Sequence, residues 1–255
     1  MHLASVLAGF VMHSPHVTLP GSFLVNLQIL LRWIHFVAGI AWIGLLYFFN
    51  LVNTPFLKAI DAPTRSKVLP VLMPRALWWF RWSAVVTVLA GIWYWMTIVG
   101  ADARNAQASG GPAISTFFII WTAVFAAELG LLLGPLEGLR KGPVFGVMTG
   151  VAVIAASYLY LALNSHGWES NRLLAIGIGG GIGWVLLLNV WGIIWRGQKK
   201  IIRWTRESAA QGTPLPPEAA RLARLGYLAS RAGLVLSFPL LFFMAAASHY
   251  PIFGP

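Results

Sequence analysis

The sequence predicts an all-α integral membrane protein, a bundle of about six transmembrane helices with both termini outside. Of its 255 residues, 58% are hydrophobic and only 10% are charged, whereas a soluble domain averages about 25% charged residues. The mean hydropathy is +0.74. Six apolar runs, separated by polar segments, are each long enough to cross a bilayer, which takes about 20 residues.

The six predicted spans follow an apolar N-terminal segment that is too short to cross a membrane. Residues 1–22 are expected to form an extramembrane or interfacial arm, and residues 23–255 the six-helix transmembrane domain. A basic segment at about 196–227, expected to be a cytoplasmic loop, contains Pro216 and Pro217 at the start of a further helical pattern. The spans are expected at about residues 24–53, 77–99, 113–135, 143–163, 172–195 and 228–248.

The loops between these spans alternate in charge, which predicts their orientation. Loops one, three and five are basic, and loops two and four carry few charges. Because loops rich in Lys and Arg stay in the cytoplasm, both termini are expected to be periplasmic. The net charge of +11 is then a property of the cytoplasmic loops, and no nucleic-acid partner is expected.

His35 lies inside the first predicted span, where ionisable residues are costly and commonly functional. Arg32, His35, Gly39 and Trp42 share one face of this helix by their three-and-four spacing. A glycine one turn from a histidine leaves room for a porphyrin, and Arg32 can pair with a propionate. The pattern therefore predicts a haem b site, with an interhelical hydrogen bond from His35 as the alternative.

His249 and His166 are the candidate second ligands of this haem iron. The predicted topology places both on the outer side, where His13 and His16 also fall. The chain contains no cysteine, which excludes disulfides, iron–sulfur clusters and a covalent c-type haem. The expected ligands of the haem iron are thus His35 and His249, or His35 and His166.

Two further patterns occur inside the spans. Arg81 and Glu128 are predicted at similar depth in the inner halves of the second and third spans, which favours an internal ion pair, with a proton path as the alternative.

The glycine run over residues 177–183 favours tight helix packing, since small residues four apart let backbones approach. A flat ligand on the glycine face is the alternative.

Four stretches resemble one family: LLRWIHFVAGIAWIG, WWFRWSAVVTVLAG, NVWGIIWRGQKKII and FFMAAASHYPIF, in the family's order over about residues 27–253. They are similar to the membrane domain of bacterial membrane-bound urate oxidases, the urate oxidase N-terminal domain family. The resemblance implies a protein of the bacterial inner membrane that passes electrons to a cytochrome c. The matching positions include His35, Trp42, Arg81, Gln198, Lys199, Lys200 and His249.

The chain departs from the family pattern in three places. It ends at Pro255, without the family's later spans and C-terminal cytochrome c domain. Ser83 stands where the family has a carboxylate, and Ser230-Arg231-Ala232-Gly233 stands where it has a stretch rich in His and Asn. The substituted positions are candidates for purine binding. The scaffold is therefore expected to be retained, and urate oxidation is one of the alternatives for its function.

Three functions follow from these observations. The first is a membrane redox subunit that holds haem b and passes electrons to a periplasmic cytochrome c or a larger electron-transfer complex. The second is a structural subunit of an energy-transducing membrane complex, without a cofactor. The third is urate oxidation with the cytochrome c supplied by another chain. All three place the protein in the lipid bilayer.

Overall fold

The computed structural model describes residues 18–253, which form helices and contain no strand. Six helices are long and apolar enough to cross a membrane, which confirms the all-α class and the predicted number of spans. The first 17 residues of the expected N-terminal arm lie outside the described part. The six helical rods are α2 (Phe23–Tyr47) with the π-helix η1 (Phe48–Asn53) and α3 (Thr54–Ala59); α4 (Ala62–Asn105); α5 (Gly111–Leu133); α6 (Gly142–Ala162); α7 (Asn171–Asn189) with the π-helix η3 (Val190–Ile194) and α8 (Trp195–Gln211); and α9 (Glu218–His249).

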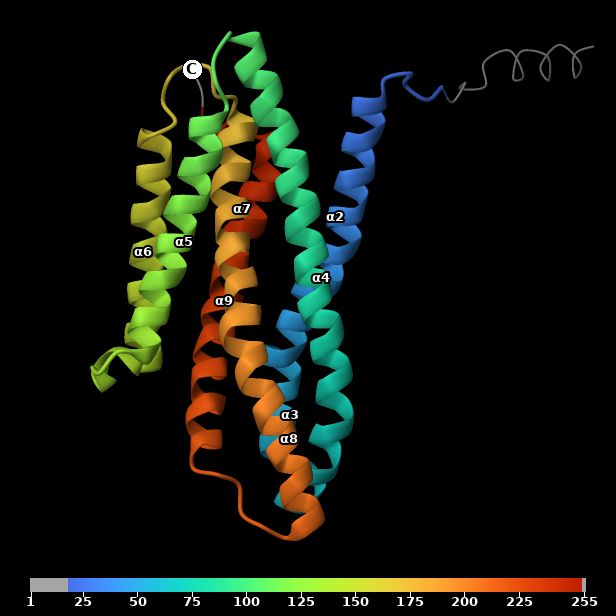
Figure 1. The fold of residues 1–255 in the computed structure, drawn as a ribbon, viewed down its shortest axis with the longest axis vertical. Helices are drawn as coiled ribbons and strands as arrows, with labels where there is room; N and C mark the ends of the chain where they lie inside the picture. The colour runs from blue at the N-terminus through green and yellow to red at the C-terminus, as the bar shows by residue number, and fades with distance from the viewer. Residues whose placement is uncertain (1–17, 254–255) are drawn as a thin grey trace, which may run out of the picture.

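Several helices are longer than the membrane is thick. The 44 residues of α4 rise about 66 Å at about 1.5 Å per residue, whereas the hydrocarbon core is about 30 Å thick. Figure 1 shows α3, α8 and the beginnings of α4 and α9 continuing past the ends of α5 and α6. The segment predicted as a loop at 196–227 is therefore mostly helix. Hydropathy identifies only the apolar part of such a helix. The polar residues that extend the same helix beyond the membrane are then predicted as a loop.

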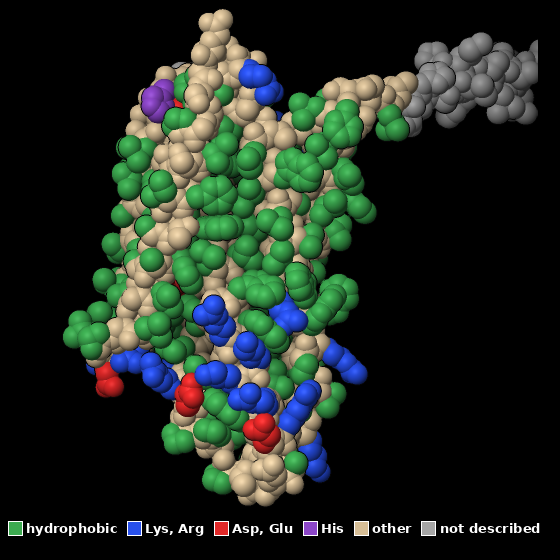
Figure 2. All heavy atoms as spheres, in the orientation of Figure 1, with side chains coloured by type: hydrophobic (Ala, Val, Ile, Leu, Met, Phe, Trp, Pro, Cys, Tyr) green, Lys and Arg blue, Asp and Glu red, His purple; other side chains and the backbone are tan. Residues whose placement is uncertain are grey.

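The two ends of the bundle differ in charge. Lys and Arg side chains gather over the lower part of the molecule in Figure 2, which we call the basic end. The opposite end, where the described chain both begins and ends (Figure 1), we call the terminal end. At the basic end Asp61 caps α4 by accepting a hydrogen bond from the backbone N–H of Thr64. Hydrogen bonds from the Thr64 side chain and backbone lower the pKa of this carboxyl.

α7 is the most deeply buried of the spans and lies at the centre of the bundle. Its glycine face meets two aromatic side chains that are themselves fully buried, Tyr160 of α6 and Trp121 of α5. A Cβ atom added at Gly177 would overlap the Tyr160 ring, and one added at Gly181 would overlap the Trp121 indole. The space left by these glycines is therefore filled by neighbouring helices, in agreement with the packing interpretation and not with a flat ligand.

We expect Gly181→Ala to destabilise the folded protein, because its new methyl group overlaps the Trp121 indole. Overpacking of a tight interior costs about 1–3 kcal/mol. Gly183→Ala is the matched control on the same helix, since its Cβ would lie 3.6 Å from the Leu240 Cδ1, an ordinary contact. Thermal unfolding of both variants in detergent measures the difference. Equal melting temperatures would contradict this account of α7.

Candidate functional site

A polar cavity of about 440 Å³ lies at the terminal end, where α4 ends, α7 begins and α9 ends. We call it the terminal pocket. It brings together residues from three segments that are far apart in the sequence. Its walls are formed by Ile98, Asp102, Ser170, Asn171, Arg172, Ala247, Ser248, His249, Tyr250 and Pro251.

One side of the terminal pocket is held in place by Ser170, the N-cap residue of α7. The Ser170 hydroxyl accepts a hydrogen bond from the Leu173 N–H at 3.2 Å, as N-cap side chains do. The same hydroxyl donates to Asp102 Oδ2 at 2.6 Å, and the Ser170 N–H donates to the same oxygen at 3.3 Å. The last turn of α4 is thus bound to the start of α7, and the Asp102 carboxylate has a fixed position.

The other side depends on Asn171, which ties the C-terminal segment to α7. Its Oδ1 accepts hydrogen bonds from the N–H groups of Ile252 and Phe253, each at 2.9 Å. Its Nδ2 donates to the carbonyls of Ala247 and Tyr250, each at 3.2 Å. All the hydrogen-bonding groups of this amide are engaged, so the segment after α9 lies in a defined conformation over the pocket.

Four exposed side chains of the terminal pocket have polar groups that can meet a ligand: Arg172, Ser248, His249 and Tyr250. Within residues 18–253, the Arg172 guanidinium and the His249 imidazole take part in no hydrogen bond or ion pair. The pocket therefore combines a permanent cation, an imidazole able to exchange a proton, and the fixed Asp102 carboxylate. Such a set suits a small polar anion that loses a proton when it reacts.

His35 is placed at the contact between α2 and α4. Its Nδ1 lies 2.8 Å from the Thr87 carbonyl oxygen, so the N–H form of this nitrogen donates to the backbone of α4. Gly91 lies against the ring, because a Cβ there would come 2.7 Å from Nδ1. The interhelical hydrogen bond expected as the alternative role of His35 is present.

The face of α2 that was expected to hold a haem is covered by α4. A Cβ on Gly39 would lie 3.6 Å from Thr87 Cγ2, so the room beside this glycine is already occupied. Arg32 lies over the ring of Tyr94, with 5.8 Å between its Cζ and the centroid, and Trp42 is 2% exposed. A porphyrin on this face would have to separate α2 from α4. In this packing the residues around His35 do not fit a haem.

The histidines expected as second ligands occupy other places. His249 lines the terminal pocket. His166 is exposed in the loop before α7, where its Nδ1 lies 2.7 Å from Glu169 Oε1. Within residues 18–253, no three His, Asp or Glu side chains are close enough together to hold a metal ion. The two histidines thus have different surroundings, the terminal pocket for His249 and the Glu169 carboxylate for His166.

Arg81 and Glu128 have separate partners in the structure. The Arg81 Cζ lies 3.8 Å from the centroid of Trp195 and 5.7 Å from that of Trp191. Glu128 accepts a hydrogen bond at 2.9 Å from Asn189. The ion pairs among the described residues do not include an Arg81–Glu128 pair within 4.0 Å. The similar depth of Arg81 and Glu128 in their spans suggested a direct ion pair. In the structure Arg81 instead makes a cation–π contact with Trp195, and Glu128 instead binds the Asn189 amide.

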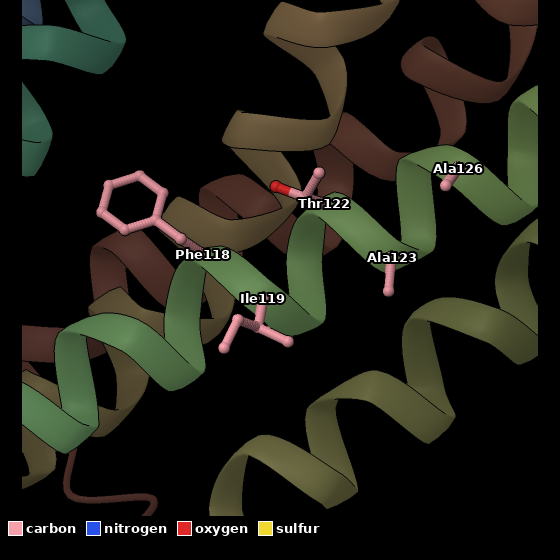
Figure 3. Close-up of a pocket in the computed structure, with 5 residues that line it drawn as sticks. All are labelled: Phe118, Ile119, Thr122, Ala123 and Ala126. Atoms are coloured by element: carbon pink, nitrogen blue, oxygen red, sulfur yellow. The ribbon is translucent and has the colours of Figure 1, made fainter.

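A second hollow, of about 390 Å³, lies along α5 and is apolar. Figure 3 shows Ile119 and Ala123 directed toward α6, with Phe118 and Thr122 on the other side of the helix. The Thr122 hydroxyl accepts a hydrogen bond from the Trp184 indole N–H at 3.1 Å. With no other polar side chain among its lining residues, this hollow suits a hydrocarbon chain and lacks the groups for a reaction.

Four residues of the terminal pocket were not singled out from the sequence: Asp102, Ser170, Asn171 and Arg172. The predicted topology could have indicated that they lie near His249, since it places loops two and four on the same side of the membrane as this histidine. Conventional motifs do not connect them, because each segment contributes only one or two side chains.

The family model described as urate oxidase N-terminal matches residues 59–254. No curated protein and no solved structure matches the chain. The family match includes α4 to α9 and every residue of the terminal pocket, and it agrees with the resemblance in the sequence. The chain therefore belongs to the urate oxidase N-terminal family.

Proposed function

We propose that this protein is a membrane redox subunit that oxidises a small anionic substrate of the urate class in the terminal pocket and passes the electrons to a periplasmic c-type cytochrome. The observation that supports this most directly is the pocket itself, where Arg172 and His249, which pair with no side chain within residues 18–253, line the same wall as the fixed Asp102. Membership of the urate oxidase N-terminal family supports the substrate class.

Each free group has a role in this proposal. The Arg172 guanidinium pairs with the negative charge of the substrate and orients it, because its planar fork matches flat anions. The His249 imidazole accepts a proton as the substrate is oxidised. Asp102, already bound by Ser170, forms a negatively charged part of the pocket wall. In this oxidation the monoanionic substrate gives up two electrons and one proton to form a neutral dehydrogenated product; His249 accepts the proton, and two ferric cytochromes each take one electron.

The orientation of the bundle decides where this chemistry occurs. The basic end carries the Lys and Arg residues of loops one, three and five. By the positive-inside rule this end faces the cytoplasm, and the terminal pocket then opens to the periplasm. A soluble c-type cytochrome, or one attached to another chain, reaches that face directly. Electron transfer from a substrate in the pocket therefore does not require a haem within the bundle.

The first test is reduction of cytochrome c by the purified protein in the presence of urate. We expect His249→Ala to lower kcat/KM by about 10²-fold or more, as loss of a proton-accepting group does. His166→Ala is the matched control, because this histidine is exposed at the same end but pairs with Glu169 outside the pocket. The rate of ferrocytochrome formation is followed optically.

Two results would overturn the proposed reaction. One is equal activity of the His249→Ala and His166→Ala variants. The other is a folded wild-type protein that reduces no cytochrome c with urate, which would favour the structural-subunit alternative.

A separate prediction concerns His35. We expect His35→Ala to leave the visible absorption spectrum unchanged and to reduce stability by about 1 kcal/mol, the size of an interhelical hydrogen bond in a membrane. The physical reason is that the imidazole donates to the Thr87 carbonyl and faces the α4 backbone. Spectra and thermal unfolding of both proteins measure this. Loss of a Soret band in the variant would instead establish His35 as a haem ligand.

The orientation can be tested directly, because the chain has no cysteine of its own. Single cysteines are introduced by Ser109→Cys, between α4 and α5, and by Thr213→Cys, between α8 and α9; both positions are exposed. In intact spheroplasts we expect a membrane-impermeant maleimide to label the first variant only. Labelling of the Thr213→Cys variant alone would reverse the orientation and place the terminal pocket in the cytoplasm.

A further inference from the structure

Glu128 lies inside the membrane-spanning part of α5 and is 1% exposed. Its Oε2 accepts a hydrogen bond from Asn189 Nδ2 at 2.9 Å. In the described structure its Oε1 and the Asn189 Oδ1 are both buried and have no hydrogen-bond partner. Buried polar atoms without partners are rare in native proteins, and each calls for an explanation such as a bound water, an ion or a chemical role.

No cation neutralises this carboxyl among the described residues. Arg81 is the charged residue of the membrane part of α4, and it lies over Trp195. α6 carries no charge, and Tyr160 is the titratable residue on its buried face. The arginine of α7, Arg172, belongs to the opposite end of that helix.

Two further charged groups, Glu137 and Arg140, lie in η2 (Glu137–Arg140), beyond the end of α5. A carboxylate anion buried without a counter-charge is costly in a low-dielectric interior. The neutral, protonated carboxyl is the form that these surroundings accommodate.

The backbone next to Asn189 is unusual in the same place. α7 ends at Asn189, and the π-helix η3 begins at Val190. π-helical turns occur often at functional sites, where the extra residue redirects side chains. Here Asn189 meets α5, while Trp191 and Trp195 meet Arg81 of α4. The irregular turn thus lies between two polar contacts, the buried Asn189–Glu128 hydrogen bond and the partly buried contact of Arg81 with Trp191 and Trp195.

We propose that Glu128 and Asn189 form a proton-binding site within the membrane, in which the Glu128 carboxyl takes up and releases a proton. Asn189 holds the carboxyl in position through Oε2, so Oε1 is the atom that binds the proton. The protonated Oε1 and the free Asn189 Oδ1 provide a donor and an acceptor, the two partners that one bound water needs. Glu128 is five residues from the end of α5 at Leu133, or about 7.5 Å along the axis, so the proton exchanges with water at the basic end.

The test uses dicyclohexylcarbodiimide, an apolar reagent that reacts with protonated carboxyls. The carboxyl O–H adds across a C=N bond, its proton moves to nitrogen, and the O-acylisourea rearranges to a stable N-acylurea; nothing leaves. On the full chain in native membranes, we expect one adduct at Glu128 by peptide mass spectrometry. Its yield should fall as the pH rises, because the anion does not carry the proton that the reaction needs.

Two variants make the result specific. Glu128→Gln keeps the shape of the side chain and should lose the adduct entirely. Glu137→Gln is the matched control, since Glu137 is exposed in the loop after α5, and it should keep the adduct at Glu128. Failure to label Glu128 at any pH at which the protein stays folded would overturn the proposal. Labelling that does not change with pH would also overturn it, because the carboxyl would then not exchange its proton.

Infrared spectroscopy provides a second measurement that does not depend on entry of the reagent. A protonated carboxyl gives a carbonyl band above the amide I region. We expect such a band in the wild-type protein, a shift to lower frequency in D₂O, and loss of the band in Glu128→Gln. A band that is absent from the wild type would contradict a protonated Glu128. The site does not depend on the proposed substrate, since both measurements are made without urate or cytochrome c.

Discussion

The close packing of α7 against its neighbours is the constraint on which the rest of the structure depends. Gly177 and Gly181 lack the side chains that would keep Tyr160 and Trp121 away, so α5 and α6 approach the backbone of α7 directly. Within a bilayer there is little hydrophobic driving force between helices, and close van der Waals contact replaces it. Because α7 also packs against α4 and α9, both of its ends are held in fixed positions relative to those helices.

Each end of α7 organises one polar site. At the terminal end, Ser170 and Asn171 bind Asp102 and the segment after α9, and together they shape the terminal pocket. Toward the basic end, Asn189 binds Glu128 where the π-helical turn begins. One rigid helix therefore separates a solvent-accessible polar pocket from a buried carboxyl. The oxidation that we propose in the terminal pocket and the proton binding that we propose at Glu128 thus lie toward opposite ends of this helix.

His35 shows how one sequence pattern can serve two different structures. A histidine followed by a glycine one turn later leaves room on a helix face, and that room can receive a porphyrin or another helix. In this protein α4 occupies it, with Thr87 against Gly39 and Gly91 against the imidazole. The ring then donates to the Thr87 carbonyl, and the histidine contributes to the pairing of the first two spans.

The sequence by itself determined that the chain is a helical membrane protein, how many spans it has, and which family it belongs to, because apolar run length and short motifs are local properties. It also placed His249, Asp102 and Arg172 on one side through the order of the loops. Only the tertiary structure decided which side chains meet. Depth along a span is encoded in sequence position, but the direction in which a residue faces across the bundle depends on helix rotation and on π-helical turns such as η3, which shift every later side chain. For that reason Arg81 meets Trp195 and Glu128 meets Asn189.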